Sequence, residues 1–339
     1  MEGFLPLEWA VFWTIVALPF IAYGIYAMGK FFKENPEKKL SVALSGAFIV
    51  ILSSLKIPSV TGSSSHPTGT GLSVILSGPW ITVVICTIVL LFQATFMAHG
   101  GFTTLGANVF SMGIAGPFVA YGVFKWLNKM HANPTAMVFV VVFVADIVTY
   151  LVTSLQLTLI VPYTGMGAFI DTYATFFGIF AVTQLPIAVL EGVLIVLFFR
   201  YLADVRPDLV KGIGYDTSVR QTKSILSDDE PKEGIFHTTR TKLTLAAFAI
   251  LAGVMIVFVY FTTFFSDYGG ADDAGGEAIF DLIPGYEQLT ENIIQLGEFN
   301  ISILFIIQTT IGVLLLAYVT YLLNKRKNEK NAKDVQEES

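Results

Sequence analysis

The sequence predicts an all-α protein that crosses a membrane several times. Hydrophobic residues make up 54% of the 339 residues, and charged residues make up only 14%. Uncharged stretches of about 20 apolar residues span the hydrocarbon core of a bilayer as helices. The chain contains several such stretches, among them Trp80–Ala98 and Leu243–Phe265. These observations place the chain among polytopic membrane proteins.

Eight apolar stretches are clear candidates for membrane-spanning helices. They are residues 7–28, 40–55, 80–98, 105–125, 134–161, 172–201, 243–265 and 301–323. The first is not a cleaved signal peptide, because its apolar run exceeds the roughly 7–15 residues of such peptides and no basic segment precedes it. The single cysteine, Cys86, lies within one of these stretches. Neither a disulfide framework nor a thiolate metal cluster is therefore expected.

Basic residues predict which ends of these helices face the cytoplasm. Loops that are rich in Lys and Arg stay on the cytoplasmic side of a membrane. The basic segments are Lys30–Lys39, Lys125–Lys129, Arg206–Lys242 and Lys325–Lys333. Eight crossings cannot place all four segments in the cytoplasm, so the alternation requires one more crossing between Lys56 and Trp80.

The only apolar run available for this additional crossing is Gly71–Gly78. It is too short for a regular helix through about 30 Å of hydrocarbon, so we predict a short or broken crossing near residues 66–78. The chain then makes nine crossings. Its amino terminus and His66 lie on the outer side, and its carboxyl terminus lies in the cytoplasm.

The same reading divides the chain into two membrane parts. Residues 1–210 form a bundle with seven crossings, and residues 241–326 form a two-helix segment around an acidic outer loop, residues 266–300. Residues 211–240 are charged and polar, which is typical of a linker, and residues 327–339 form a cytoplasmic tail. This organisation suggests a fusion of two ancestral chains.

A polar, glycine-rich insert, Ser63–Gly71, interrupts the apolar sequence. It reads Ser-Ser-Ser-His-Pro-Thr-Gly-Thr-Gly. Irregular polar backbone at membrane depth is tolerated only where protein buries it or where it lines a cavity. Hydroxyl groups, glycines that allow close approach and the imidazole of His66 together suit a site for a small metal ion. The alternative is a hydrogen-bonded loop histidine without a ligand.

Four further residues are candidates for functional roles. His99 precedes Gly100 and Gly101 in what looks like a tight turn, and Asn108 follows at a position from which it can bridge to the insert. Asp146 and Glu191 fall within apolar stretches, where ionisable residues are costly and often functional. For these two acids we favour hydrogen bonding between helices, and contact with a partner protein is an alternative for Glu191.

Several short motifs resemble one known family. They are Glu2–Pro6, Ser54–Pro58 running into Ser63–Gly71, and His99–Asn108 followed by Ser111–Gly113. Together they resemble the CbiM/NikM family, the substrate-binding components of energy-coupling-factor (ECF) transporters for cobalt or nickel. The resemblance covers residues 2 to about 205.

The carboxyl-terminal part resembles the small CbiN/NikN subunit of the same transporters. It has two apolar stretches around an acidic segment that contains Gly270–Asp273 and Pro284–Tyr286. It departs from that subunit where Gln288 and Leu289 replace the usual Pro-Trp.

The resemblance implies a nitrogen-rich, near-planar metal site. In the family, the ligands are the terminal amine, the backbone amide and imidazole of a second-position histidine, and the histidine of the serine-rich loop. The residues that correspond here are Met1 for the terminal amine, His66 for the loop histidine, and Ser64, Ser65, His99 and Asn108 as supporting residues. Such nitrogen ligands favour Ni(II) or Cu(II).

The second-position histidine has no counterpart, because Glu2 and Gly3 follow Met1 directly. Family members typically have Met-His-Ile ahead of the equivalent Glu-Gly. We expect that Met1 is internal to a longer chain and that three residues of the natural amino terminus are missing from this sequence. The alternative is that this member binds the ion differently.

These features predict uptake of Ni(II), with Co(II) uptake for cobalamin synthesis as the alternative. The ion is the transported substrate, and no cofactor is expected. The sequence has no Gly-x-x-x-x-Gly-Lys-Ser/Thr phosphate-binding loop, so the resemblance implies an ECF membrane scaffold subunit and separate ATP-binding subunits. A carrier or channel that needs no ATPase is a further alternative.

A membrane enzyme is the competing class, and it is not favoured. The sequence contains neither a His-Glu-x-x-His zinc motif nor a Gly-x-Ser-x-Gly nucleophile motif. The expected location is the cell membrane, in contact with the lipid bilayer, and no nucleic-acid partner is expected. Small residues at Ala10, Ala17 and Gly24 recur at helical spacing, and we expect them to pack against helices of the same chain.

Overall fold

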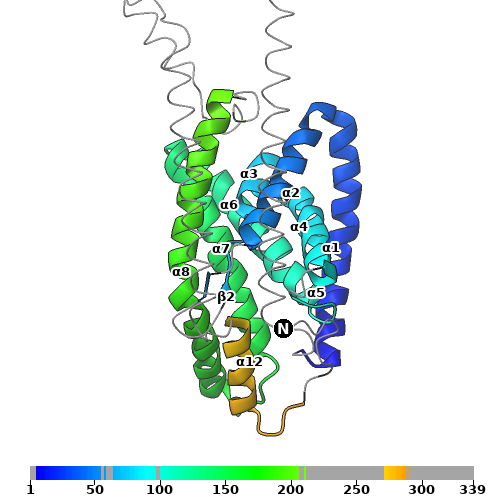
Figure 1. Ribbon diagram of the computed structural model, residues 1–339, viewed down its shortest axis with the longest axis vertical. Coiled ribbons are helices and arrows are strands. Elements are labelled where there is room, and N and C mark those ends of the chain that lie inside the picture. The colour runs from blue at the N-terminus through cyan, green and yellow to red at the C-terminus, as the bar shows by residue number, and fades with distance from the viewer. Residues whose placement is uncertain are drawn as a thin grey trace, which may run out of the picture.

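Long helices that run side by side make up the described part of the chain (Figure 1). The structure is a computed structural model, and it describes residues 5–54, 57–58, 64–96, 100–205, 210, 271–287 and 289. Within this part, five helical segments are long and apolar enough to cross a membrane. The predicted class, an all-α polytopic membrane protein, is confirmed.

The helices and strands follow one another in this order. They are α1 (Leu7–Glu34), η1 (Pro36–Lys38), α2 (Lys39–Ser54), β1 (Ile57–Pro58), β2 (Ser64–Ser65), α3 (Thr70–Ser77), α4 (Pro79–Phe96), α5 (Leu105–Asn108), η2 (Val109–Ala115), α6 (Gly116–Lys129), α7 (Pro134–Thr158), α8 (Met166–Val205) and α12 (Ala271–Leu282). The two short strands pair with each other in antiparallel register. The predicted helices at 243–265 and 301–323, the linker and the tail lie outside the described residues.

Helix α3 occupies the place of the predicted short crossing. It has eight residues, and its amino-terminal flank, Gly69, and its carboxyl-terminal flank, Gly78, both have positive φ angles, of 70° and 81°. At 1.5 Å per residue it is about 12 Å long, less than half of a hydrocarbon core. Residues 70–75 are all buried, so the short helix lies inside protein and not against lipid.

The number of membrane crossings in residues 1–210 stays a prediction. Five described segments have the length of a membrane span, whereas α2 with 16 residues and α3 with eight do not reach that length. Together α2, the insert and α3 fill the centre of the bundle between the longer helices (Figure 1).

Glycines allow the short helices to approach the long ones closely. A Cβ atom on Gly71 of α3 would lie 2.7 Å from the Cα of Val142 in α7. A Cβ atom on Gly24 of α1 would lie 2.8 Å from the backbone oxygen of Trp80 in α4. The small residues of α1 therefore pack against the chain's own helices, as expected.

A π-helix, η2, interrupts the third membrane-length segment. Residues 105–129 begin as α5, continue as the π-helix Val109–Ala115 and end as α6. The sequence predicted one regular helix here. A π-turn contains one more residue than an α-turn, so the residues after it face a different side of the helix. A Cβ atom added to Gly113 in this segment would lie 3.2 Å from the Cβ of Cys86 in α4.

Helix α8 is the longest described element. It has 40 residues and contains Pro186 in its interior. It packs along α7 for much of its length (Figure 1). Near one end it also contacts α12, and its other end lies close to residue 210, where the predicted linker begins.

Candidate metal centre

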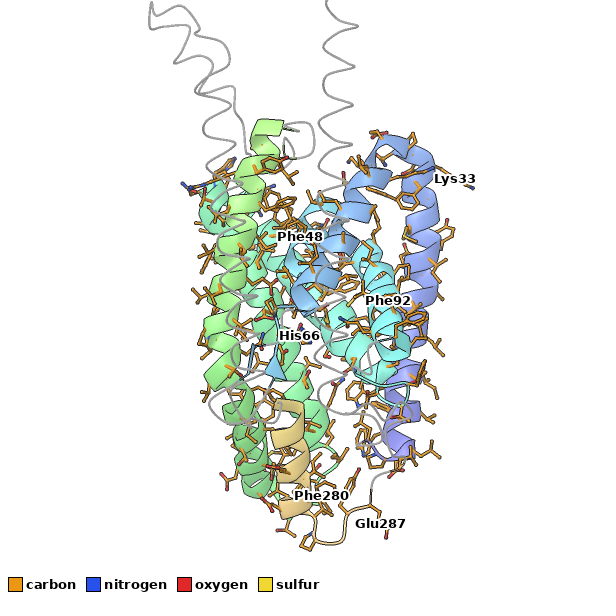
Figure 2. All side chains as sticks on the ribbon, viewed as in Figure 1. Lys33, Phe48, His66, Phe92, Phe280 and Glu287 are labelled. Atoms are coloured by element: carbon orange, nitrogen blue, oxygen red, sulfur yellow. The ribbon has the colours of Figure 1, made fainter. Side chains whose placement is uncertain are left out.

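His66 lies in the loop of residues 66–69 that joins β2 to α3. Figure 2 shows it inside the bundle, between the end that carries Lys33 and the end that carries Glu287. The residue is half-buried, and its Nδ1 atom lies 3.0 Å from the backbone oxygen of Pro67. In the tautomer that donates Nδ1–H to this oxygen, the lone pair is on Nε2, which is the form of imidazole that binds a metal.

The backbone of the loop is held by side chains from α7 and α8. The carbonyl oxygen of His66 accepts hydrogen bonds from the Tyr150 hydroxyl at 3.4 Å and from Gln184 Nε2 at 3.3 Å. Tyr150 belongs to α7 and Gln184 to α8. The backbone position of His66 is therefore set from outside the loop.

Glu191 holds the other end of the loop with both of its carboxylate oxygens. Its Oε2 accepts the backbone N–H of Thr68 at 2.7 Å, and its Oε1 accepts the backbone N–H of Gly69 at 3.0 Å. Glu191 is fully buried, and hydrogen bonds to a charged acceptor are about twice as strong as neutral ones. The expectation of buried hydrogen bonding is thus confirmed, although the partner is the insert and not another helix.

Asp146 approaches the same loop from α7. Its Oδ2 accepts a hydrogen bond from Gln184 Nε2 at 2.6 Å, and the side chain is fully buried. Its Oδ1 has no hydrogen-bond partner within the described residues, and the same is true of Gln184 Oε1. The carboxyl groups of Asp146 and Glu191 are close enough for their charges to interact.

The other predicted site residues are placed only in part. Ser64 and Ser65 form β2 and pair with Pro58 and Ile57. Asn108 is half-buried at the end of α5 and donates a hydrogen bond to Thr104 Oγ1 at 3.4 Å within the same turn. A bridge from Asn108 to the insert stays a prediction.

Two predicted residues, Met1 and His99, lie outside the described residues. Among the residues that the structure describes, no three His, Cys, Asp or Glu side chains lie together in a group that could hold a metal. Of the predicted nitrogen ligands, the described part of the chain therefore contains His66 alone.

The sequence analysis missed the two side chains that hold the His66 carbonyl, Tyr150 and Gln184. The signal was present in their spacing. Tyr150 follows Asp146 by four residues on α7, and Gln184 precedes Glu191 by seven residues on α8. Residues at these spacings share one face of a helix, so two polar faces in apolar helices pointed to one polar interior.

Helix α12 lies next to the insert and belongs to the segment predicted as an acidic outer loop. It contacts α8 and β2. Ile279 is fully buried, and Gly275 lies against Leu157 and Phe180. Glu277 is exposed, so the described part of the loop is a helix with an apolar face on the bundle.

The residues after α12 reach the first turn of α1. Burial and the nearby carboxylate of Glu8 both raise the pKa of the Tyr286 hydroxyl, burial having the larger effect. This segment therefore extends from α8 to the amino-terminal end of α1, across the end of the bundle that is nearer to Glu287 in Figure 2.

Two family models match separate parts of the chain. Residues 1–209 match CbiM, described as the cobalt uptake substrate-specific transmembrane region. The chain belongs to the CbiM family. Residues 239–333 match the cobalt transport protein component CbiN. The resemblance drawn from the motifs is confirmed, and a CbiM region fused to a CbiN region accounts for both parts.

Relatives of known name match the CbiM region. The putative cobalt transport protein CbiM 1 of Methanosphaerula palustris is 52% identical over 226 residues, which are 67% of this chain and 97% of the relative. The cobalt transport protein CbiM of Carboxydothermus hydrogenoformans is 53% identical over 203 residues, 60% of this chain and 82% of the relative.

A crystal structure of a truncated transition metal transporter shares the fold. It superposes with a TM-score of 0.51 at 23% identity, over 60% of this chain and 97% of that chain. CbiM is a transport component of the membrane and not an enzyme, and the prediction of a polytopic membrane transport protein is confirmed.

Proposed function

We propose that this chain is the ion-binding membrane component of a multisubunit uptake transporter and that its substrate is Co(II). The observation that supports this most directly is the match of residues 1–209 to a cobalt-uptake region, together with the placement of His66 in a polar loop inside the bundle. The relatives reported above are named for cobalt, so our prediction of Ni(II) gives way to its alternative.

In this proposal His66 supplies one nitrogen ligand, and the terminal amine of the natural chain, at Met1 or at a residue before it, supplies a second. Imidazole and amine nitrogens bind both Co(II) and Ni(II), and affinity generally rises from cobalt to nickel. Geometry and the supply of metal therefore decide which ion is carried. Nickel is retained as the second candidate because these donors bind it at least as tightly as cobalt.

The energy for uptake comes from other polypeptides. The full sequence contains no phosphate-binding loop. The matched family is described as the substrate-specific region of cobalt uptake, and this description implies that other subunits carry out the remaining steps. We infer an ECF-type assembly in which a membrane scaffold and ATP-binding subunits contact this chain from the cytoplasmic side. From the basic loops we infer an amino terminus on the outer side and a carboxyl terminus in the cytoplasm.

The test is metal binding by the purified full chain with its natural amino terminus. Co(II), Ni(II) and Cu(II) are titrated separately, and His66→Ala is compared with His131→Asn. His131 is exposed and has a φ angle of 53°, a conformation that asparagine tolerates, so it is a matched control. We expect His66→Ala to lose cobalt binding and His131→Asn to keep it. Equal binding by the wild type and His66→Ala contradicts the proposal.

A second measurement separates the proposal from an ATPase-independent carrier. Cobalt uptake is compared in host cells with and without the scaffold and ATP-binding subunits. We expect uptake only when they are present, and uptake that persists without them supports the carrier.

A further inference from the structure

Asp146 has an oxygen atom that no described residue satisfies. Its Oδ1 is buried and has no hydrogen-bond partner within the described part of the chain. The neighbouring Gln184 uses its Nε2 to donate to Asp146 Oδ2 and to the His66 carbonyl. This leaves Gln184 Oε1 as a second buried oxygen without a partner among the described residues.

Gln184 Oε1 is an acceptor, and Asp146 Oδ1 is an acceptor when its carboxyl group is ionised. Buried polar atoms in native proteins are nearly always hydrogen-bonded, and each exception calls for a ligand, a water or a functional role. An acceptor is satisfied by a donor or by a cation. Two unsatisfied acceptors on hydrogen-bonded neighbours therefore indicate a missing electropositive partner.

The charge balance points to a cation. Asp146 and Glu191 are both fully buried, and neither forms an ion pair with any residue that the structure describes. A buried carboxylate is strongly unfavourable in its ionised form without a cation, so Asp146 holds either a proton or a cation. The hydrogen bonds of Glu191 to Thr68 and Gly69 use both of its oxygens, whereas Asp146 has one oxygen left over.

The two oxygens lie next to the backbone of the predicted metal ligand. Gln184 bonds to the backbone carbonyl of His66 and to Asp146 with the same nitrogen atom. An ion that is bound through neutral nitrogen ligands carries its full positive charge into the bundle, and the nearest carboxylate balances that charge most effectively.

We propose that Asp146 Oδ1 and Gln184 Oε1 form an oxygen subsite beside His66 that binds and neutralises the divalent cation within the bundle. The inference rests on the proposed function, since it assumes that the cation reaches His66. Glu191 has a different role, because it positions the loop through Thr68 and Gly69.

The test compares Asp146→Asn with Glu191→Gln, since both replace a buried carboxylate by an amide of the same shape. The melting temperature of each purified full chain is measured without metal and during titration with Co(II). A ligand that binds only the folded state raises the melting temperature in proportion to its affinity. His66→Ala is included in each series.

We expect Asp146→Asn to melt at or above the wild-type temperature without metal, because asparagine keeps an acceptor for Gln184 Nε2 and needs neither a proton nor a cation to be neutral. Its cobalt Kd is expected to rise about 10- to 100-fold, the range found when residues that support metal ligands are replaced. Glu191→Gln is expected to melt at a lower temperature without metal.

A variant that keeps the carboxylate on a side chain one methylene group longer is the positive control. Asp146→Glu keeps the charge, and we expect it to bind cobalt more tightly than Asp146→Asn. If the asparagine variant does not fold, Asp146→Thr, which is close to aspartate in volume, takes its place in the comparison.

Three results are decisive against the subsite. Wild-type cobalt affinity in Asp146→Asn, with binding lost in His66→Ala, overturns the subsite and leaves the proposed function intact. A lower melting temperature of Asp146→Asn without metal, with an unchanged cobalt shift, assigns Asp146 a purely structural role. Equal weakening of cobalt binding in the Asn and Glu variants excludes the charge of Asp146 as the cause.

Failure of the wild type to bind any of the ions overturns the proposed function itself.

Discussion

At the scale of single residues, Glu191 is the side chain that fixes the insert. It accepts two backbone N–H groups from consecutive residues, Thr68 and Gly69, at 2.7 and 3.0 Å. These N–H groups precede the first turn of α3, where no helical carbonyl satisfies them. One buried carboxylate thus satisfies two consecutive backbone donors immediately before α3.

We predict that Glu191→Gln destabilises the protein by about 1–3 kcal/mol, the cost of leaving a buried hydrogen-bonding group unsatisfied. Glutamine offers one oxygen for two N–H donors, so one of the donors faces an NH2 group. Chemical denaturation in detergent measures the loss. Glu277→Gln is the control, because Glu277 is exposed on α12, and an equal loss in both variants contradicts the prediction.

The sequence could identify Asp146 and Glu191 as important but not their partners. Ionisable residues within apolar stretches are visible in any sequence. Their contacts, however, are with backbone or amide groups more than 35 positions away, as the separations of 122 and 38 residues for Glu191–Gly69 and Asp146–Gln184 show. Backbone atoms are the same at every residue, so no side-chain pattern reveals that Glu191 binds the N–H groups of Thr68 and Gly69.

At the scale of elements, close contact determines where α3 sits. The helix lies against α7 at Gly71, where an added Cβ would be 2.7 Å from the Cα of Val142. Because the obstructing atom is backbone, no rotamer change relieves the clash. A methyl group at this position must push the two helices apart.

We predict that Gly71→Ala lowers the melting temperature, whereas Gly122→Ala leaves it unchanged or raises it. An added Cβ on Gly122 of α6 meets no atom within 4 Å, and alanine favours a helix over glycine by roughly 1 kcal/mol. Overpacking of a tight contact costs about 1–3 kcal/mol. Thermal unfolding of the two variants checks the prediction, and a similar effect of both substitutions contradicts it.

Helix α12 provides a second prediction at this scale. Ile279 is fully buried in a cluster that includes Leu157 and Phe180, whereas the next residue, Phe280, is 44% exposed. We expect Ile279→Ala to weaken the docking of α12 by about 2–5 kcal/mol and to speed hydrogen exchange in residues 271–287. Phe280→Ala should change the exchange much less, and faster exchange in both variants to the same degree argues against specific docking.

The sequence located most helices well because apolar length is a direct consequence of the membrane. The run Gly71–Gly78, for example, was recognised as short, and the helix spans Thr70–Ser77. The π-helix was not visible, because its residues are as apolar as their neighbours and the extra residue per turn is set by packing against α4 and α7. The helical character of residues 271–282 was also missed, since their acidic side chains resemble those of a solvated loop.

At the scale of the whole molecule, the chain combines a polar loop buried in an otherwise apolar bundle with a surface suited to lipid. Large hydrophobic side chains on α1, such as Ile15, Leu18 and Ile25, are more than half exposed, which fits contact with lipid tails. Polar groups are instead gathered around the insert. The orientation of this bundle in the bilayer, which we inferred from the positions of the basic loops, stays a prediction.

The hydrogen bonds of Gln184 and Glu191 to the insert have a mechanical consequence for the whole molecule. Gln184 and Glu191 lie on opposite sides of Pro186 in α8, and proline removes one backbone hydrogen bond from a helix interior. A bend of α8 at Pro186 changes the distance between the side chains of Gln184 and Glu191, and this stretches or relaxes residues 66–69, to which both are hydrogen-bonded.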